Sequence, residues 1–232
     1  MSKKILVLLS GGTDSATCLA QAVKEVGAEN VETLNMTYGQ RHVKEIENAK
    51  VLTEYYGVNY TLVDLSEVFN FSNCALLGHS TDEIKHESYT SQVNNLEGDE
   101  KINTYVPFRN GVMLSVCTTF ALSKGCSEIY IGSHASDHAY PDCTPEFDSA
   151  MKDAIYEGSG HKVLPKYPLW DKTKTEVIKL GLELGVPYGL TWSCYEGKEK
   201  ACGKCASCID RMNAFKENGA TDPIEYEGDE IE

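Results

Sequence analysis

A glycine-containing segment near the start of the chain has the composition of a phosphate-binding turn. The residues Ser-Gly-Gly-Thr-Asp-Ser, at 10–15, follow an aliphatic run at 5–9 and precede apolar residues spaced three and four apart. At such a junction of strand and helix, backbone N–H groups and hydroxyls can converge on an anion at the positive end of the helix dipole. An isolated Gly-Gly pair is better explained as an ordinary capped turn, but this context favours phosphate binding. The chain has no G-x-G-x-x-G or Gly-Lys-Ser/Thr loop, which excludes dinucleotide folds and Walker ATPases.

Four of the nine cysteines have the spacing of metal ligands. They form the pattern C-x7-C-x2-C-x2-C at Cys194, Cys202, Cys205 and Cys208. Four thiolates complete a tetrahedral Zn²⁺ site at ~2.3 Å per sulfur, so structural zinc is the favoured interpretation. An iron–sulfur cluster or a redox pair for sulfur transfer is the alternative. The other five lack ligand spacing and are expected to be small buried hydrophobes: Cys18, Cys74, Cys117, Cys126 and Cys143.

The elements that must position these residues alternate between strands and helices. Strands are predicted at 5–9, 31–36, 60–63, 129–132 and near Val163, and helices at 15–26, 44–56, 110–123, 145–156 and 173–184. This alternation predicts an α/β fold, Rossmann-like, with a mostly parallel sheet and helices on both faces. Ligands of such sheets bind beyond the carboxyl ends of the strands, where the 10–15 segment lies. The irregular stretch 69–103 is long for a connection and predicts a lid or substrate loop.

Length and composition predict a main domain with a small appendage. The 232 residues are divided into a nucleotide-binding catalytic domain at 1–185, a zinc-binding subdomain at 186–221 and an acidic tail at 222–232, expected to be disordered. A net charge of −14 repels polyanions, so direct nucleic-acid binding is not expected. Apolar runs are shorter than the ~20 residues of a membrane-spanning helix. The N-terminal apolar run is also too short for a signal peptide, which predicts a cytoplasmic protein.

The motifs resemble those of one enzyme family. The 10–15 segment resembles the PP-loop of the adenylating superfamily, which includes NAD and GMP synthetases, asparagine synthetase and tRNA-thiolating enzymes. The segments Thr-Trp-Ser-Cys-Tyr at 191–195 and Cys-Gly-Lys-Cys-x-x-Cys at 202–208, with Arg211, resemble the C-terminal signature of the 7-cyano-7-deazaguanine synthase (QueC) family. Other matching pieces lie at 38–42, 106–110, 140–143 and 168–172. The resemblance covers nearly the whole chain.

The resemblance implies an ATP-dependent ligase that forms a C–N bond. Its expected reaction converts 7-carboxy-7-deazaguanine and ammonia into the nitrile through an adenylated carboxylate and an amide, with two ATP consumed to AMP and pyrophosphate. The product would serve queuosine or other deazapurine biosynthesis, and a homodimer is expected. Mg²⁺ is the expected companion of ATP, with Asp14 as one contact. The ATP site is expected at Leu8, Leu9, Ser10, Gly11, Gly12, Thr13, Asp14, Ser15, Ala16, Thr17, Cys18 and Arg41.

The same resemblance assigns roles to a few polar residues. Asp14, Ser15, Arg109 and Lys172 are predicted to be catalytic, with the cations placed against phosphates or the substrate carboxylate. For Arg41, Arg109 and Lys172 the alternative is a surface salt bridge, and Asn110 fits a helix cap equally well. The predicted substrate contacts are Arg109, Asp137, Tyr140 and Asp142, because purine-type rings need an aromatic platform and hydrogen-bond acceptors. An acidic surface loop is the alternative for the last three.

Other functions remain open on sequence grounds. A tRNA thiolase or another ammonia-dependent amide synthetase would share the loop, although a thiolase should carry an RNA-binding domain and a basic surface. A zinc-stabilised nucleotide-binding module without turnover is a second alternative. A third is a relative that stops at the amide, or that transfers the deazaguanine in nucleic-acid modification or phage defence.

Overall fold

The chain folds around a five-stranded parallel sheet with the strand order β3-β2-β1-β4-β5. We describe a computed structural model that covers residues 3–98, 100–134, 140–196 and 199–228. The strands are β1 (Ile5–Leu8), β2 (Val31–Thr37), β3 (Asn59–Asp64), β4 (Glu128–Tyr130) and β5 (Leu164–Lys166). Strand order reverses at β1, which pairs with β2 on one side and β4 on the other. The turn after β1 therefore lies at the switch point where open parallel sheets bind ligands.

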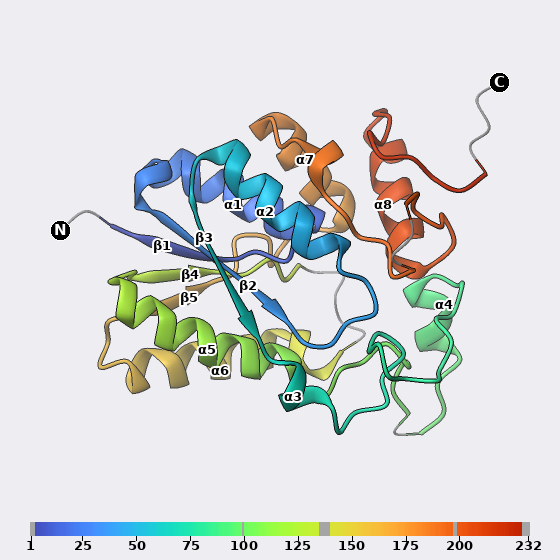
Figure 1. The fold of residues 1–232 in the computed structure, drawn as a ribbon, viewed down its shortest axis with the longest axis horizontal. Helices are drawn as coiled ribbons and strands as arrows, with labels where there is room; N and C mark the ends of the chain where they lie inside the picture. The colour runs from blue at the N-terminus through green and yellow to red at the C-terminus, as the bar shows by residue number, and fades with distance from the viewer. Residues whose placement is uncertain (1–2, 99, 135–139, 197–198, 229–232) are drawn as a thin grey trace.

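Helices cover both faces of the sheet (Figure 1). One face carries α1 (Thr13–Val26), α2 (Lys44–Tyr56) and α7 (Lys174–Leu184), whose buried residues form a core with Ile5 and Val7. The other face carries α5 (Arg109–Lys124) and α6 (Pro145–Gly158), which pack with Leu6 and Ile129. Alternate residues of β1 thus enter opposite cores, as expected for a strand buried on both faces. The predicted fold class is confirmed.

Short elements and a last helix complete the chain. Helix α3 (Ser66–Phe69) precedes the predicted irregular stretch, α4 (Tyr89–Asn94) lies within it, and α8 (Ala206–Glu217) follows the cysteines. Single turns of 3-10 helix lie at Ala28–Asn30, Pro141–Cys143 and Tyr188–Leu190. Both α4 and α8 lie beyond the carboxyl ends of the strands (Figure 1). Among the described residues, none of the helices combines the length and hydrophobicity that crossing a bilayer requires.

The first part of the acidic tail is packed, and the prediction of disorder is wrong for residues 222–228. Asp222 accepts two hydrogen bonds from the buried Arg211 guanidinium, at 2.8 and 2.9 Å. Tyr226 is buried with the cysteine residues and forms a parallel bridge with Ala201. A bidentate, buried ion pair and a buried aromatic ring outweigh the solvation of the neighbouring acidic side chains.

Candidate active site

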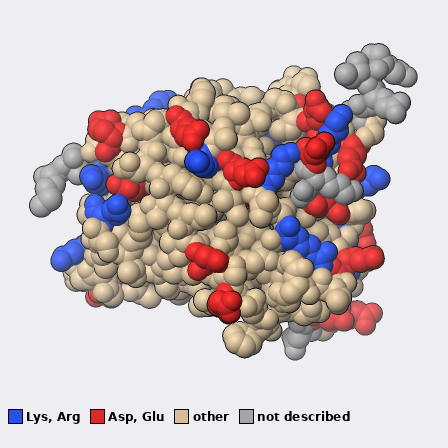
Figure 2. Space-filling view, in the orientation of Figure 1, with Lys and Arg blue, Asp and Glu red and all other residues tan. Residues whose placement is uncertain are grey.

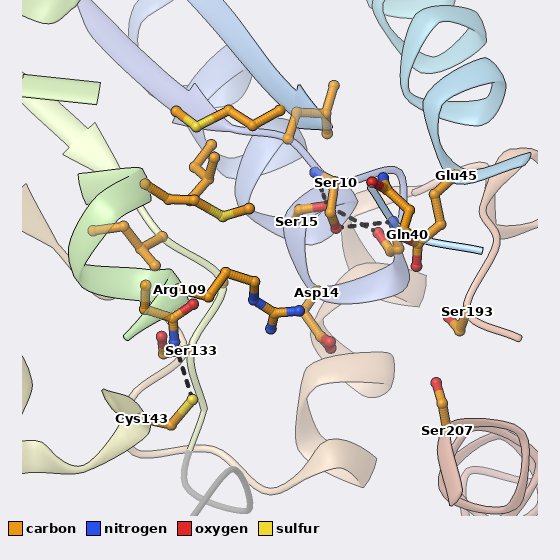
Figure 3. A pocket seen from close by; sticks show the side chains of 18 of the residues that line it. Ser10, Asp14, Ser15, Gln40, Glu45, Arg109, Ser133, Cys143, Ser193 and Ser207 are labelled. Carbon is orange, nitrogen blue, oxygen red and sulfur yellow. Dashed lines mark hydrogen bonds between the residues drawn. The ribbon is translucent and has the colours of Figure 1, made fainter. Parts of the chain in front are cut away.

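A cavity of about 260 Å³ opens at the carboxyl end of the sheet. The phosphate-loop segment contributes Leu8, Leu9, Ser10, Gly12, Asp14 and Ser15 to its wall. Further side chains of the lining come from α2, α5, α7 and residues 192–208, which we call the cysteine segment. Figure 3 shows Glu45, Arg109 and Ser193 among them. Elements far apart in the sequence therefore meet at the turn after β1.

The phosphate loop is held open by hydrogen bonds between its own serines. Ser10 Oγ and Ser15 Oγ are 3.0 Å apart, and the Ser10 N–H donates to Ser15 Oγ at 3.2 Å (Figure 3). The Gly12 N–H donates to Ser10 Oγ at 3.3 Å, and Ser15 Oγ donates to the Gly12 carbonyl at 3.2 Å. The loop leads directly into the first turn of α1, whose N–H groups are available to an anion.

Glycines allow this loop to pack against its neighbours. Gly11 has φ of +95°, and a Cβ there would lie 2.2 Å from the Glu45 carbonyl oxygen of α2. Gly132 approaches the start of α1 so closely that a Cβ would lie 3.1 Å from the Ser15 nitrogen. Any side chain at Gly11 would therefore collide with backbone in an already unfavourable conformation.

Asp14 and Lys174 form an ion pair inside the cavity. Lys174 Nζ donates to both Asp14 carboxylate oxygens, at 2.6 and 2.7 Å, and to Thr13 Oγ1 at 2.9 Å. Burial acts to raise the pKa of Asp14, but the charge of Lys174, assisted by His134, lowers it overall. Lys174 is the first residue of α7, where a cation opposes the helix dipole. This placement is unfavourable for the helix alone and suits a site that must hold phosphates.

Five of the residues predicted for the ATP site within 8–18 do not line the cavity: Gly11, Thr13, Ala16, Thr17 and Cys18. Thr17 Oγ1 donates to the Thr13 carbonyl at 2.8 Å and lies 2.8 Å from the Tyr188 hydroxyl. Cys18 is fully buried, and this burial raises the pKa of its thiol far above the usual range. Thr17 and Cys18 are thus buried in α1 and support the loop from the protein interior.

Arg109 reaches into an aromatic part of the same cavity. Its Nη1 lies 3.3 Å from the Tyr38 hydroxyl, and its guanidinium carbon lies 5.1 Å from the centre of the Tyr38 ring. Tyr140 also lines this part; its ring stacks on Tyr105 at 6.0 Å, and its hydroxyl lies 2.9 Å from Thr104 Oγ1. Among the described residues, Arg109 has no carboxylate within salt-bridge distance. It is therefore positioned to receive an external anion.

Two further tyrosines close the aromatic part. Tyr89 belongs to α4, within the predicted lid segment, and its hydroxyl is hydrogen-bonded to that of Tyr195, which follows the first ligand-spaced cysteine. Burial raises the pKa of both hydroxyls well above their usual value, so both stay neutral. A contact between His86 Nε2 and Glu196 Oε1, at 2.8 Å, joins the same two segments.

Glu45 stands out because it is an acidic side chain in a cavity shaped for anions. It lines the cavity from the first turn of α2, and its side chain is 17% exposed. Burial raises the pKa of Glu45, and the nearby His42 and Arg109 only partly oppose the shift. Its neighbour Gln40 is oriented by the Tyr38 N–H, which donates to Gln40 Oε1 at 2.8 Å.

Some predicted residues are not brought to the cavity. Lys172 Nζ lies 3.0 Å from Asp171 Oδ1 and does not line the cavity. Lys174 occupies the position in the cavity wall that was predicted for Lys172. Arg41 donates to the carbonyls of Leu77, Ser80 and Asp82, and so anchors the 77–82 segment. Asp137 lies outside the described residues.

Asp142 is also absent from the cavity wall, because it accepts hydrogen bonds from Asn110 at the start of α5. Its Oδ2 accepts from the Asn110 N–H at 2.9 Å, and its carbonyl accepts from Asn110 Nδ2 at 2.8 Å. Asn110 itself does line the cavity. The start of α5, which carries Arg109, is thus fixed by the turn that follows Tyr140.

Sequence reasoning assigns no site role to several polar or aromatic residues of the wall, among them Tyr38, Glu45, Tyr89, Lys174 and Tyr195. Tyr195 enters the sequence analysis only as the last residue of the 191–195 motif, and Lys174 is two residues from Lys172. A signal existed for Lys174, since a lysine at a helix start needs an anionic partner. Glu45 and Tyr89 carry no signal in the sequence alone, because one is on a polar helix and the other is in the irregular stretch.

The four ligand-spaced cysteines converge on one buried point. Their sulfur atoms all lie within 4.8 Å of one another. Cys194 Sγ accepts N–H groups of Glu196 and Cys202 at 3.4 and 3.3 Å, and Cys202 Sγ accepts those of Lys204 and Cys205 at 3.4 and 3.3 Å. Such N–H···S bonds stabilise thiolate ligands. The cluster therefore fits a tetrahedral metal ion.

The chain matches one protein family along most of its length. The family model of queuosine biosynthesis protein QueC matches residues 4–219. A relative from Colwellia psychrerythraea named 7-cyano-7-deazaguanine synthase 1 is 41% identical over 229 residues, covering 98% of this chain and 100% of the relative. A relative from Thermoplasma acidophilum named 7-cyano-7-deazaguanine synthase is 43% identical, covering 97% of this chain and 92% of the relative.

A solved structure supports the fold alone. The NMN synthetase from Francisella tularensis shares it with a TM-score of 0.53 at 16% identity, covering 95% of this chain and 79% of the synthetase. Family membership itself rests on the sequence relatives and the family model. The chain therefore belongs to the QueC family of queuosine biosynthesis proteins.

Proposed function

We propose that this protein is an ATP-dependent ligase that converts 7-carboxy-7-deazaguanine and ammonia into 7-cyano-7-deazaguanine. The observation that carries the proposal is one cavity in which a phosphate loop with Lys174 faces Arg109 and a group of tyrosines. The names of the relatives agree with this reaction. The alternative, an enzyme that stops at the amide or transfers the deazaguanine, has no specific observation in its favour.

The phosphate loop would hold the pyrophosphate part of ATP. The N–H groups at the start of α1 and the hydroxyls of Ser10 and Ser15 suit phosphate oxygens, and Lys174 adds a positive charge. Asp14 would then contact Mg²⁺, whose preferred ligands are carboxylate and phosphate oxygens. Mg²⁺ supplies further neutralisation of phosphate charge when it is bound.

The aromatic part would hold the deazaguanine. Tyr38, Tyr89, Tyr140 and Tyr195 offer ring faces and neutral hydroxyls to a planar heterocycle. Arg109, which has no carboxylate partner among the described residues, would bind the substrate carboxylate and direct one of its oxygens towards the α-phosphorus. Adenylation makes that oxygen a leaving group, so ammonia can displace AMP and form the amide. A second adenylation, on the amide oxygen, permits loss of AMP to give the nitrile.

The cysteine cluster would hold a structural Zn²⁺. The four buried sulfurs leave no place for a fifth, substrate-binding ligand, in keeping with closed structural sites. Four reduced thiolates require a reducing compartment, which supports a cytoplasmic location. A homodimer is part of the proposal by analogy with the family and is measured by light scattering in solution.

Direct nucleic-acid binding is not part of the proposal. The net charge is −14, and on the face in Figure 2 the Lys and Arg side chains lie among Asp and Glu side chains. A polyanion would meet no concentrated positive field on that face. A gel-shift titration with tRNA at low salt tests this part.

The deciding experiment is mass spectrometry of purified protein with ATP, Mg²⁺, ammonium and 7-carboxy-7-deazaguanine. Nitrile, AMP and pyrophosphate are expected as products. Accumulation of the amide would favour the alternative reaction, and absence of AMP would leave a nucleotide-binding module without turnover. Asp14→Asn should abolish AMP formation with the fold intact, whereas Asp171→Asn, an exposed control on the pair with Lys172, should not.

A further inference from the structure

The cavity wall contains an acidic side chain without a strong cationic partner. Among the described lining residues, the acids are Asp14 and Glu45. Asp14 is paired with Lys174, but the recorded partner of Glu45 is His42 Nδ1 at 3.9 Å. Within the described part of the chain, neither a lysine nor an arginine lies within salt-bridge distance of the Glu45 carboxylate. Glu45 therefore brings to the cavity a carboxyl group that no described Lys or Arg neutralises.

Such a charge works against the two anions that the cavity would hold. Like charges repel strongly in a partly enclosed site, so an uncompensated carboxylate weakens binding of both ATP and a carboxylate substrate. A positively charged ligand bound by Glu45 would offset this repulsion of the two anionic substrates. Of the reactants proposed above, one is a cation at neutral pH, namely ammonium.

The charged neighbours of Glu45 locate it on the carboxylate side of the cavity. The groups that act on it are His42, Arg109 and, more weakly, Cys194. Glu45 also acts on Tyr38, whose hydroxyl contacts Arg109 at 3.3 Å. Figure 3 shows Arg109 extending from α5 into the cavity, with Glu45 and Gln40 on the opposite wall. A cation held by Glu45 would thus lie near a carboxylate held by Arg109.

We infer that the Glu45 carboxylate binds the ammonium ion and accepts its proton as the nitrogen attacks the adenylated carbon. This inference rests on the proposed function. Ser193 and Gln40 line the same cavity and would offer neutral oxygens to other N–H groups of the ammonium ion. Burial that raises the pKa of Glu45 also makes it a better proton acceptor.

The step balances in atoms and charge. Ammonium transfers one proton to the Glu45 carboxylate, and the resulting ammonia uses its lone pair to form the C–N bond. The carbonyl carbon then expels AMP, whose phosphate oxygen keeps the electron pair of the broken C–O bond. The attacking nitrogen releases a second proton to solvent, which leaves the neutral amide and AMP. No oxidant or further reactant is needed.

Glu45→Gln tests the inference, because it removes the charge while keeping the shape. Exchange of labelled pyrophosphate into ATP, at saturating ATP and 7-carboxy-7-deazaguanine and without ammonium, should not fall below that of wild type, since adenylation precedes the nitrogen step and removing the charge relieves repulsion of both anions. In the full reaction, kcat/KM for ammonium should fall by about 10²-fold or more. Hydroxylamine, which is uncharged at neutral pH, should restore much of the rate. Glu47→Gln, an exposed acid in the same helical turn, is the matched control.

The results separate this inference from its alternatives. An equal loss of exchange and amide formation, relieved by excess Mg²⁺, would make Glu45 a magnesium ligand and overturn the inference. An unchanged kcat/KM for ammonium would overturn it too. If wild-type protein shows no exchange that depends on 7-carboxy-7-deazaguanine, the proposed function itself fails, and the inference with it. Retained exchange in the variant also shows that it is folded.

Discussion

Replacing Lys174 by Met tests the cation that the structure brings to the phosphate loop. Lys174 Nζ lies 2.6 and 2.7 Å from the two Asp14 oxygens, and its side chain is 16% exposed. Met keeps most of the apolar stem and removes only the charge. Lys172→Met is the matched control, since Lys172 lies two residues away and pairs with the exposed Asp171.

The expected loss of rate follows from the partly enclosed position of the Lys174 side-chain amine, which carries the positive charge. Removing one preorganised group that stabilises developing charge costs about 2.7–4 kcal/mol, which corresponds to about 10²–10³-fold in kcat. Lys174→Met should therefore slow pyrophosphate exchange by that factor, and Lys172→Met should change it by less than about 3-fold, the scale of a surface ion pair. Initial rates of exchange at saturating ATP give both numbers.

The same variant has a signature in the pH dependence of stability. Lys174 lowers the pKa of Asp14 below its ordinary value of about 3.9, so the pair stabilises the fold above that pH and the contribution is lost as pH falls through the lowered pKa. In the variant, burial still acts to raise the pKa of Asp14, and only His134 and the Thr13 hydroxyl remain to oppose it. The wild type should exceed the variant in free energy of unfolding by about 1–3 kcal/mol at neutral pH, and the gap should close in acid.

Two results would refute this reasoning. Near-normal exchange in Lys174→Met would remove Lys174 from the phosphate site. Equal losses in the two variants would mean that the lysines act through the start of α7 as a whole. Urea titrations across the acid range check the stability part independently, because they need neither ATP nor substrate.

Three other perturbations give separate tests. Cys205→Ser should abolish binding of one zinc per chain, measured by elemental analysis, and lower the melting temperature, since structural zinc contributes folding free energy. Gly11→Ala should destabilise the fold by more than about 2 kcal/mol in urea titration, because its Cβ would lie 2.2 Å from a carbonyl oxygen of α2, whereas Gly57→Ala, with positive φ but open space, should cost about 1 kcal/mol. Asp222→Asn should lower the free energy of unfolding by about 3 kcal/mol through loss of a buried ion pair, and Glu225→Gln, on an exposed pair, by less than about 0.5 kcal/mol.

The regular elements were predictable where one local signal dominated. The helix at 44–56 was placed at its observed bounds, because its apolar spacing ends at Gly57, which adopts the left-handed conformation that terminates helices. The strand bounds differ by one or two residues, as expected from pairing set by neighbours instead of by the strand itself. The periodicity does not predict helix α8, since two of its five buried residues, Cys208 and Arg211, do not count as apolar in such a search.

The site was harder to predict, because it depends on which side chains tertiary packing turns inwards. Two lysines flank the start of α7, and only the fold shows that Lys174, and not Lys172, faces the phosphate loop. The prediction of disorder for the acidic tail was wrong for a different reason. Its acidic residues suggested solvation, yet Ile224 and Tyr226 alternate with them and pack against the cysteine segment. A period of two in a short charged stretch was the signal that composition concealed.

The cysteine segment belongs to the active site as well as to the fold. It contributes Ser193, Tyr195 and Ser207 to the cavity wall, and the Trp192 N–H donates to the Gly11 carbonyl at 2.9 Å. The phosphate loop is therefore hydrogen-bonded to the residue two positions before the first cysteine of the cluster. A metal ion bound by the four cysteines would fix Cys194, and through it one side of the loop and the hydroxyls of Ser193, Tyr195 and Ser207. Loss of the metal should consequently weaken ATP binding before the parallel sheet unfolds.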